Sequence, residues 1–187
     1  MANDLTLEKI LLDTAIPVQY DLALLFIEMA SPAWTDYFRG KEDESFYDGV
    51  GNHYIVKHDI LARACTLISK EKENPGSQNT SLDELLDEFI GPILSIDRMD
   101  WEPAYAAERV FCACYNLLLL YTMRNRATEN AQLNIVINQA ADAMLRAQLK
   151  TLEELNVFVT NLRNNHKKTE INRSSDSLPP RAEGKVE

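Results

Sequence analysis

The chain has 187 residues, of which 45% are hydrophobic, enough for one domain with a tail or for two small domains whose cores need no disulfide or metal. With six glycines, few β-branched runs and many Leu, Ala and Glu, the composition favours helix over sheet. The net charge of −10 argues against nucleic acid or an anionic membrane as a partner, and it fits either attraction of a basic protein or solubility alone.

The amino-terminal segment and the cysteines predict a cytoplasmic protein. MANDLTLEKILLDT has acidic residues where a signal peptide carries Lys or Arg before an apolar core, and no stretch suits a membrane span. Cys65, Cys112 and Cys114 lie in apolar helical surroundings and form no CxxC pair, which is typical of reduced thiols.

The first part of the chain has the periodicity of four helices. Apolar residues recur at i, i+3, i+4 and i+7, and Pro17 and Pro32 occupy positions that suit the first turn of a helix. Residues 41–52 hold two glycines but no preceding strand, so we interpret them as a polar connection and not as a phosphate-binding loop. The expected helices are residues 4–14, 17–30, 31–40 and 53–70.

The central stretch, residues 103–124, is expected to be a helix buried on nearly all sides. From Val110 to Met123 only Asn116 and Thr122 are clearly polar. Fourteen residues of helix rise about 21 Å, which is short of the roughly 30 Å of a bilayer core, so the run is predicted to be buried by other helices. It follows residues 93–100, which we expect to be a short acidic connector.

Two capping boxes and a helix break are predicted around this central helix. Ser81 to Glu84 and Thr151 to Glu154 each have the Ser/Thr-x-x-Glu spacing that opens a helix. Gly91-Pro92 is expected to break or kink the first of these helices. A further helix is expected at about residues 131–150, before the second box.

The last 24 residues, 164–187, are polar and carry Pro-Pro, so we predict a disordered tail after a bundle domain of residues 1–163. The tail is slightly basic, so the acid excess lies in the bundle domain. No repeat signature recurs. The predicted fold is all-α, an irregular single-core helical bundle of about seven or eight helices around the central helix.

No catalytic, cofactor-binding or metal-binding motif is found. His53 and His58 are five residues apart and do not share a helix face, no Glu is followed three residues later by His, and there is no nucleophile elbow. Glu28 and Glu108 stand within or beside apolar stretches. We interpret them as members of structural ion pairs with Arg63 or Arg109, with catalytic acids as the alternative.

Acidic residues interleaved with aromatic ones give the best functional indication. Such segments suit recognition of a basic protein, in which aromatic side chains act as anchors and charge guides the approach, but a solvated face over buried aromatics fits slightly better. Trp34 and Trp101 are the candidate anchors. The candidate partner-binding acids are Asp36, Glu42, Asp43, Glu44, Asp83, Glu84, Asp87, Glu88, Asp97 and Asp100.

Three segments carry a resemblance to a known family. EMASPAWTDYF at residues 28–38 resembles a Glu-Met-Pro-aromatic-Phe segment, LDELLDEFIGPILSIDRMD occupies residues 82–100, and Tyr-Ala-Ala at residues 105–107 opens a long apolar helix. Over about residues 5–148 the chain resembles the YjaG-like bacterial proteins. The resemblance implies an all-α fold and no catalytic residues, and residues 42–51 form an extra loop relative to that family.

These observations favour a non-enzymatic, acidic binding protein of the bacterial cytoplasm. In its sharpest form the hypothesis is an immunity protein that neutralises a basic toxin domain by binding it directly. The alternatives are an enzyme that uses buried carboxylates, and a homodimeric regulatory or scaffold protein. No cofactor is expected.

Overall fold

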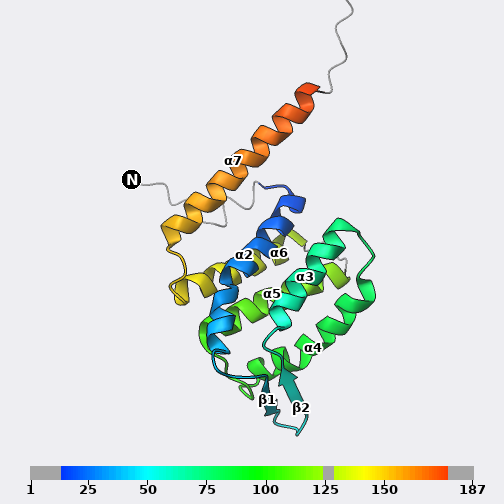
Figure 1. Cartoon of the computed structure of the whole chain (residues 1–187), viewed down its shortest axis with the longest axis vertical. Coiled ribbons are helices and arrows are strands. Elements are labelled where there is room, and N and C mark those ends of the chain that lie inside the picture. The colour runs from blue at the N-terminus through cyan, green and yellow to red at the C-terminus, as the bar shows by residue number, and fades with distance from the viewer. Residues whose placement is uncertain (1–13, 124–128, 177–187) are drawn as a thin grey trace, which may run out of the picture.

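The computed structural model of the chain describes residues 14–123 and 129–176. Within them the chain forms six helices and one two-stranded hairpin around a single core (Figure 1). The elements are α2 (Ile16–Tyr37), β1 (Glu44–Tyr47), β2 (His53–Val56), α3 (Ile60–Glu73), α4 (Asn79–Asp97), α5 (Tyr105–Met123), α6 (Glu129–Arg146) and α7 (Leu152–Asp176).

The mainly helical fold is confirmed, but the expected number of helices is wrong for this part of the chain. Six helices are present instead of seven or eight, and a hairpin accompanies them. The helix expected at residues 4–14 lies almost wholly outside the described residues. No helix among those described is both long and apolar enough to cross a membrane.

The central position of α5 is confirmed. It packs against α2, α3, α4 and α6, and Figure 1 shows it in the middle of the bundle. Phe111 is fully buried at the point where these helices meet. Its ring stacks on Trp34 at 5.2 Å and on Phe89 at 4.6 Å between ring centroids, and it meets Trp101 edge-on at 5.4 Å.

The two helices expected at residues 17–30 and 31–40 are one helix, α2, with Pro32 in its interior. Proline removes the hydrogen bond that its N–H would make to the carbonyl four residues earlier, here that of Glu28. The Ser31 hydroxyl donates a hydrogen bond of 2.8 Å to this same carbonyl oxygen. A local side-chain donor therefore satisfies the group that proline leaves open, and the helix continues.

A β-hairpin stands where we expected a polar connection at residues 41–52 and the start of a helix at His53. β1 and β2 pair antiparallel, with Phe46 opposite Tyr54 and Tyr47 opposite His53. Residues 53–56 combine aromatic and β-branched side chains, which favour a pleated, half-buried strand. On the inward face of the hairpin, the ring of Phe46 stacks on the ring of Trp101. Their centroids are 5.3 Å apart and their planes are nearly parallel.

One glycine of α4 allows the hairpin to lie directly on that helix. A Cβ atom at Gly91 would lie 2.1 Å from Cε1 of Tyr54, closer than real contacts permit. The Gly91-Pro92 pair was expected to break or kink the helix; α4 continues through it to Asp97, so no break occurs, and Gly91 forms the seat of the hairpin. Most of the acidic connector expected at residues 93–100 belongs to α4, and the non-helical connection consists of residues 98–104.

Of the two predicted capping boxes, one is confirmed. α4 begins at Asn79, which places Ser81 inside the helix, so that box is wrong. At α7, the Thr151 N–H donates to Oε2 of Glu154 at 2.7 Å, and the Glu154 N–H donates to Oγ1 of Thr151 at 3.2 Å. This reciprocal pair fixes the start of α7.

Helix α7 continues to Asp176, through residues whose composition indicated disorder. In Figure 1 its C-terminal part extends beyond the other helices. The division of the chain into a domain and a tail at residue 163 stays a prediction, and residues 177–187 lie outside those described.

Candidate interaction surface

One face of α4 presents three acids and two large apolar side chains to solvent. Asp83, Asp87, Ile90, Leu94 and Asp97 are spaced by four, three, four and three residues, so they form one stripe along the helix. All five are exposed, Ile90 by 39% and Leu94 by 45%. We call this set the acidic–apolar stripe.

The opposite face of α4 explains why the stripe faces outward. Leu82, Leu85 and Phe89 are buried in the core. Gly91 and Ser95 are buried on the side of the helix that faces the hairpin. An amphipathic helix places its continuous apolar face inward, which leaves the acids outside. Ile90 and Leu94 remain exposed because they belong to the outward face.

The outer side of the hairpin adds three exposed apolar residues beside α4. Tyr47 is 68% exposed, Val50 76% and Ile55 53%. β2 packs on α4, and Figure 1 shows the hairpin and the C-terminal half of α4 at the same end of the molecule. We call these three residues, together with the acidic–apolar stripe, the binding face; its two parts are joined where β2 packs on α4.

The tip of the hairpin is held by a single carboxylate. Asp48 is 6% exposed and accepts hydrogen bonds from the backbone N–H groups of Val50 (3.1 Å) and Asn52 (2.8 Å) and from the Asn52 side chain (2.9 Å). Burial works to raise the pKa of Asp48, but these hydrogen bonds outweigh it and hold the pKa below its ordinary value. The tip is therefore an ordered part of the surface.

Several of the predicted partner-binding acids are already engaged within the chain. Glu88 receives two hydrogen bonds from the Arg63 guanidinium and lies 3.3 Å from Lys57 Nζ, and these contacts lower the pKa of Glu88, chiefly through Arg63. Glu44 accepts a hydrogen bond from the Tyr37 hydroxyl. These two carboxylates join the hairpin to α2, α3 and α4 and are not free for a partner.

Asp36 and Asp43 are also paired. Asp36 lies against Arg39, one helical turn away. Asp43 accepts hydrogen bonds from the backbone N–H of His58 at 3.0 Å and from its ring Nδ1 at 2.9 Å, and these bonds lower the pKa of Asp43. Sequence spacing gave no sign of the Asp43–His58 pair, because the two residues meet only when the hairpin closes.

The remaining predicted acids are unpaired. Among residues 14–123 and 129–176, no hydrogen bond or ion pair is made by the side chains of Glu42, Asp83, Glu84, Asp87 and Asp97. Asp100 is half-buried beside the hairpin tip, with Oδ1 at 3.3 Å from the position of a Cβ on Gly49. Four of these unpaired acids belong to α4, so the negative charge available to a partner is concentrated there.

Both candidate anchors prove to be core residues. Trp34 is 2% exposed and Trp101 4%, and Trp34 donates a hydrogen bond of 2.8 Å from Nε1 to the backbone carbonyl of His58. Neither side chain reaches the surface. Sequence reasoning did not single out the exposed apolar residues of the binding face.

The expected inward position of Glu28 and Glu108 is also wrong. Glu28 is exposed and Glu108 half-exposed. Neither pairs with the arginines proposed for them, since Arg63 binds Glu88 and Arg109 lies against Asp142. The alternative of catalysis by buried carboxylates therefore loses the residues on which it was based.

No group of three His, Cys, Asp or Glu side chains suited to a metal comes together in the described part of the chain. Cys65, Cys112 and Cys114 carry free thiols in α3 and α5. Burial is the main cause that raises the pKa of Cys65 to about 12 and that of Cys112 to about 11. These thiols are weak nucleophiles at neutral pH.

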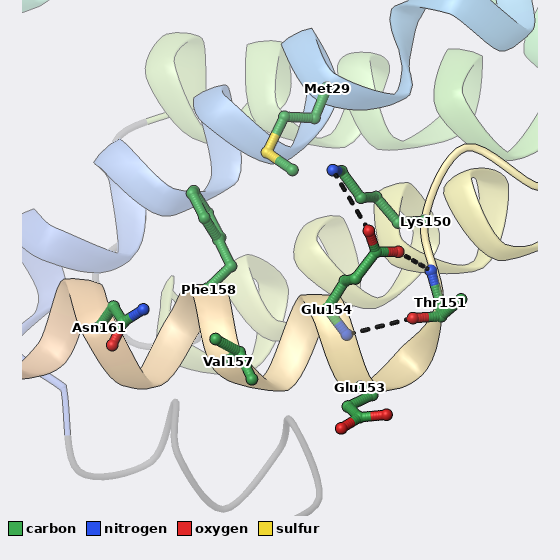
Figure 2. Close-up of a pocket in the computed structure, with 8 residues that line it drawn as sticks. All are labelled: Met29, Lys150, Thr151, Glu153, Glu154, Val157, Phe158 and Asn161. Carbon is green, nitrogen blue, oxygen red and sulfur yellow. Dashed lines mark hydrogen bonds and ion pairs between the residues drawn. The ribbon is translucent and has the colours of Figure 1, made fainter.

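A separate groove of about 540 Å³ lies where α7 begins beside α2 (Figure 2). Met29 of α2 and Phe158 of α7 border it, and its charged groups Lys150 and Glu154 approach each other at 3.9 Å. Because Glu154 also closes the capping box with Thr151, the groove offers apolar contact more than reactive groups. Its lining residues are Met29, Lys150, Thr151, Glu153, Glu154, Val157, Phe158 and Asn161.

Comparison with protein-family models, with curated proteins and with solved structures found no match for this chain. The resemblance to the YjaG-like proteins therefore stays a prediction.

Proposed function

We propose that the chain is a non-enzymatic binding protein whose binding face docks a basic protein. The observation that carries this proposal is the acidic–apolar stripe, in which exposed Ile90 and Leu94 lie between unpaired aspartates of the same helix face. Apolar residues surrounded by charge are the usual composition of an interface core and its rim. The acids supply attraction and orientation, and the apolar residues supply most of the affinity.

Charge complementarity indicates the class of partner. The chain carries a net charge of −10, and the acids of the stripe are not neutralised from within the described structure. The electrostatic field of these charges would accelerate the approach of a basic protein surface and would repel nucleic acid. In its specific form the proposal is that the partner is a basic toxin domain and that the chain is its immunity protein, acting by occlusion.

The first experiment is a pull-down from the native host with three baits. The test bait carries Asp83→Lys, Asp87→Lys and Asp97→Lys, which reverse only unpaired acids. The control bait carries Glu28→Lys, Glu73→Lys and Glu153→Lys, which make the same change of charge at exposed positions elsewhere. We expect a basic protein to be recovered by the wild type and the control and to be lost from the test bait.

The immunity function is tested with the recovered protein. Its expression alone in a heterologous bacterium should arrest growth, and co-expression of the wild-type chain should restore growth whereas the test variant should not. Equal recovery of this protein by all three baits would refute the proposal that the binding face docks it. If the recovered partner is specific but not toxic, the docking role of the binding face is retained and the immunity function is rejected.

A further inference from the structure

Two arginines and a tyrosine share one carboxylate where α5 begins and α6 ends. Nε of Arg109 lies 3.2 Å from Oδ2 of Asp142, and Nε of Arg146 lies 3.5 Å from Oδ1. The Tyr105 hydroxyl donates a hydrogen bond of 2.9 Å to Oδ2 of the same Asp142. Three donor side chains therefore converge on a single acceptor.

The carboxylate does not satisfy both guanidinium groups. The contact with Arg109 lacks the geometry of a hydrogen bond, and its buried Nε has no hydrogen-bond partner. Within the described part of the chain, the Nη groups of Arg109 and Arg146 make no hydrogen bond. Since one carboxylate neutralises one charge, the cluster keeps a positive charge in a chain that is otherwise acidic.

Both arginines also lie near the ring of Tyr105. The guanidinium carbon of Arg146 lies 5.3 Å from the ring centroid, and that of Arg109 lies 5.9 Å from it. Cations at this distance from an aromatic face are attracted to it. The two guanidinium groups are thus held near each other in spite of their like charge.

A hollow of about 490 Å³ opens beside this cluster, lined by Tyr105, Ala106 and Arg146. It borders the first turn of α5, where backbone N–H groups have no partner within the helix. Glu108, the next acid along the helix, makes no ion pair with either arginine among the described residues. The hollow therefore brings backbone donors of α5 next to the free Nη groups of Arg146.

We propose that this cluster binds a small oxyanion, a carboxylate or a phosphate, at the hollow, with Arg146 lining it and Arg109 beside Arg146 on the same Asp142 and Tyr105. The free Nη groups supply the forked donors that bind such oxygens in pairs. Tyr105 and Asp142 hold the arginines in place without occupying these donors. The site is independent of the binding face, which uses α4 and the hairpin.

The test is a titration of the ¹⁵N-labelled full chain, followed by NMR, with inorganic phosphate and, separately, acetate. Ionic strength is held constant with chloride. We expect saturable shifts at the Ala106 amide and at the Arg109 Nε–H, in one or both titrations, and these identify which oxyanion is bound. Linear drift at these signals in both titrations, or saturation at many unrelated surface sites, would overturn the proposal.

Variants separate an anion site from a purely structural network. Arg146→Gln should weaken binding about tenfold, because one charged fork is lost, whereas Arg39→Gln, at an exposed arginine that pairs with Asp36 and is not part of the cluster, should leave binding unchanged. Asp142→Asn should tighten binding several-fold, because it removes a negative charge beside the bound anion and keeps a side chain of the same shape, whose oxygen can still accept from Tyr105. Equal affinity in Arg146→Gln, or weaker binding in a folded Asp142→Asn protein, would reject the site.

Discussion

At the scale of single residues, Asp48 shows how one side chain orders part of the surface. One carboxylate organises the hairpin tip by accepting hydrogen bonds from Val50, Asn52 and, at 3.4 Å, the Tyr54 hydroxyl. The tip in turn presents Val50 to solvent as part of the binding face. The order of this surface therefore depends on a charge that is itself partly shielded from water.

The pH dependence of the hairpin follows from the lowered pKa of Asp48. A group whose pKa is lower in the folded state stabilises the fold above its unfolded pKa and loses that contribution as the pH falls through the folded value. We expect the protection of the Val50 and Asn52 amides, corrected for the intrinsic exchange rate, to fall as the pH drops below the ordinary value of 3.8, relative to amides elsewhere in the bundle.

The variant Asp48→Asn should exchange faster at these two amides already at neutral pH and change little on acidification. Asp83→Asn, at an exposed carboxylate on α4, is the matched control and should behave as the wild type. Equal protection of the tip in Asp48→Asn and wild type at neutral pH would show that the backbone alone holds the turn.

At the scale of elements, the contact between β2 and α4 couples the two halves of the binding face. The hairpin approaches closely only because Gly91 has no side chain where the ring of Tyr54 lies. Tyr54 is also held by Phe46, with ring centroids 5.6 Å apart. Its ring therefore has little freedom to move aside.

The substitution Gly91→Ala should destabilise the protein by about 1–3 kcal/mol, the usual effect of overpacking, measured by chemical denaturation. Alanine is otherwise the better helix former, by up to about 1 kcal/mol. In a Tyr54→Ala background the same Gly91→Ala change should therefore become neutral or stabilising. A loss of equal size in both backgrounds would place the cause in the helix itself and not in the contact with the hairpin.

At the scale of the whole molecule, α5 holds the core together through its contacts with four other helices. Cys114 on this helix is fully buried, and burial raises its pKa well above the ordinary value. Cys65 on α3 and Cys112 on α5 are half-buried, and their pKa values are raised as well. The reactivity of the three thiols therefore reports on opening of the bundle.

In native buffer at neutral pH we expect all three cysteines to react slowly with a thiol reagent, because the thiolate is the reactive form. Cys114 should be the slowest, and all three should react rapidly in denaturant. Mass spectrometry of the modified peptides gives the order in which the three cysteines react. Labelling of Cys114 as fast as that of an unfolded thiol would contradict the buried central helix.

The amino-acid sequence by itself determined the helical class, the central helix and the acid-rich character of α4. These follow from local periodicity and composition, which depend only on residues a few positions apart. The capping box of Thr151 and Glu154 was predictable for the same reason. The tail composition, by contrast, indicated disorder where α7 continues to Asp176.

The tertiary structure decided the features that carry function. Whether Trp34 and Trp101 are anchors or core residues depended on Phe111, Phe89 and the hairpin, which meet them only in the fold. Whether an acid is free depended on distant partners, such as Arg63 for Glu88. Periodicity predicts which face of an element is apolar, but pairing and exposure are set by neighbours far apart in the sequence, and only folding brings these together.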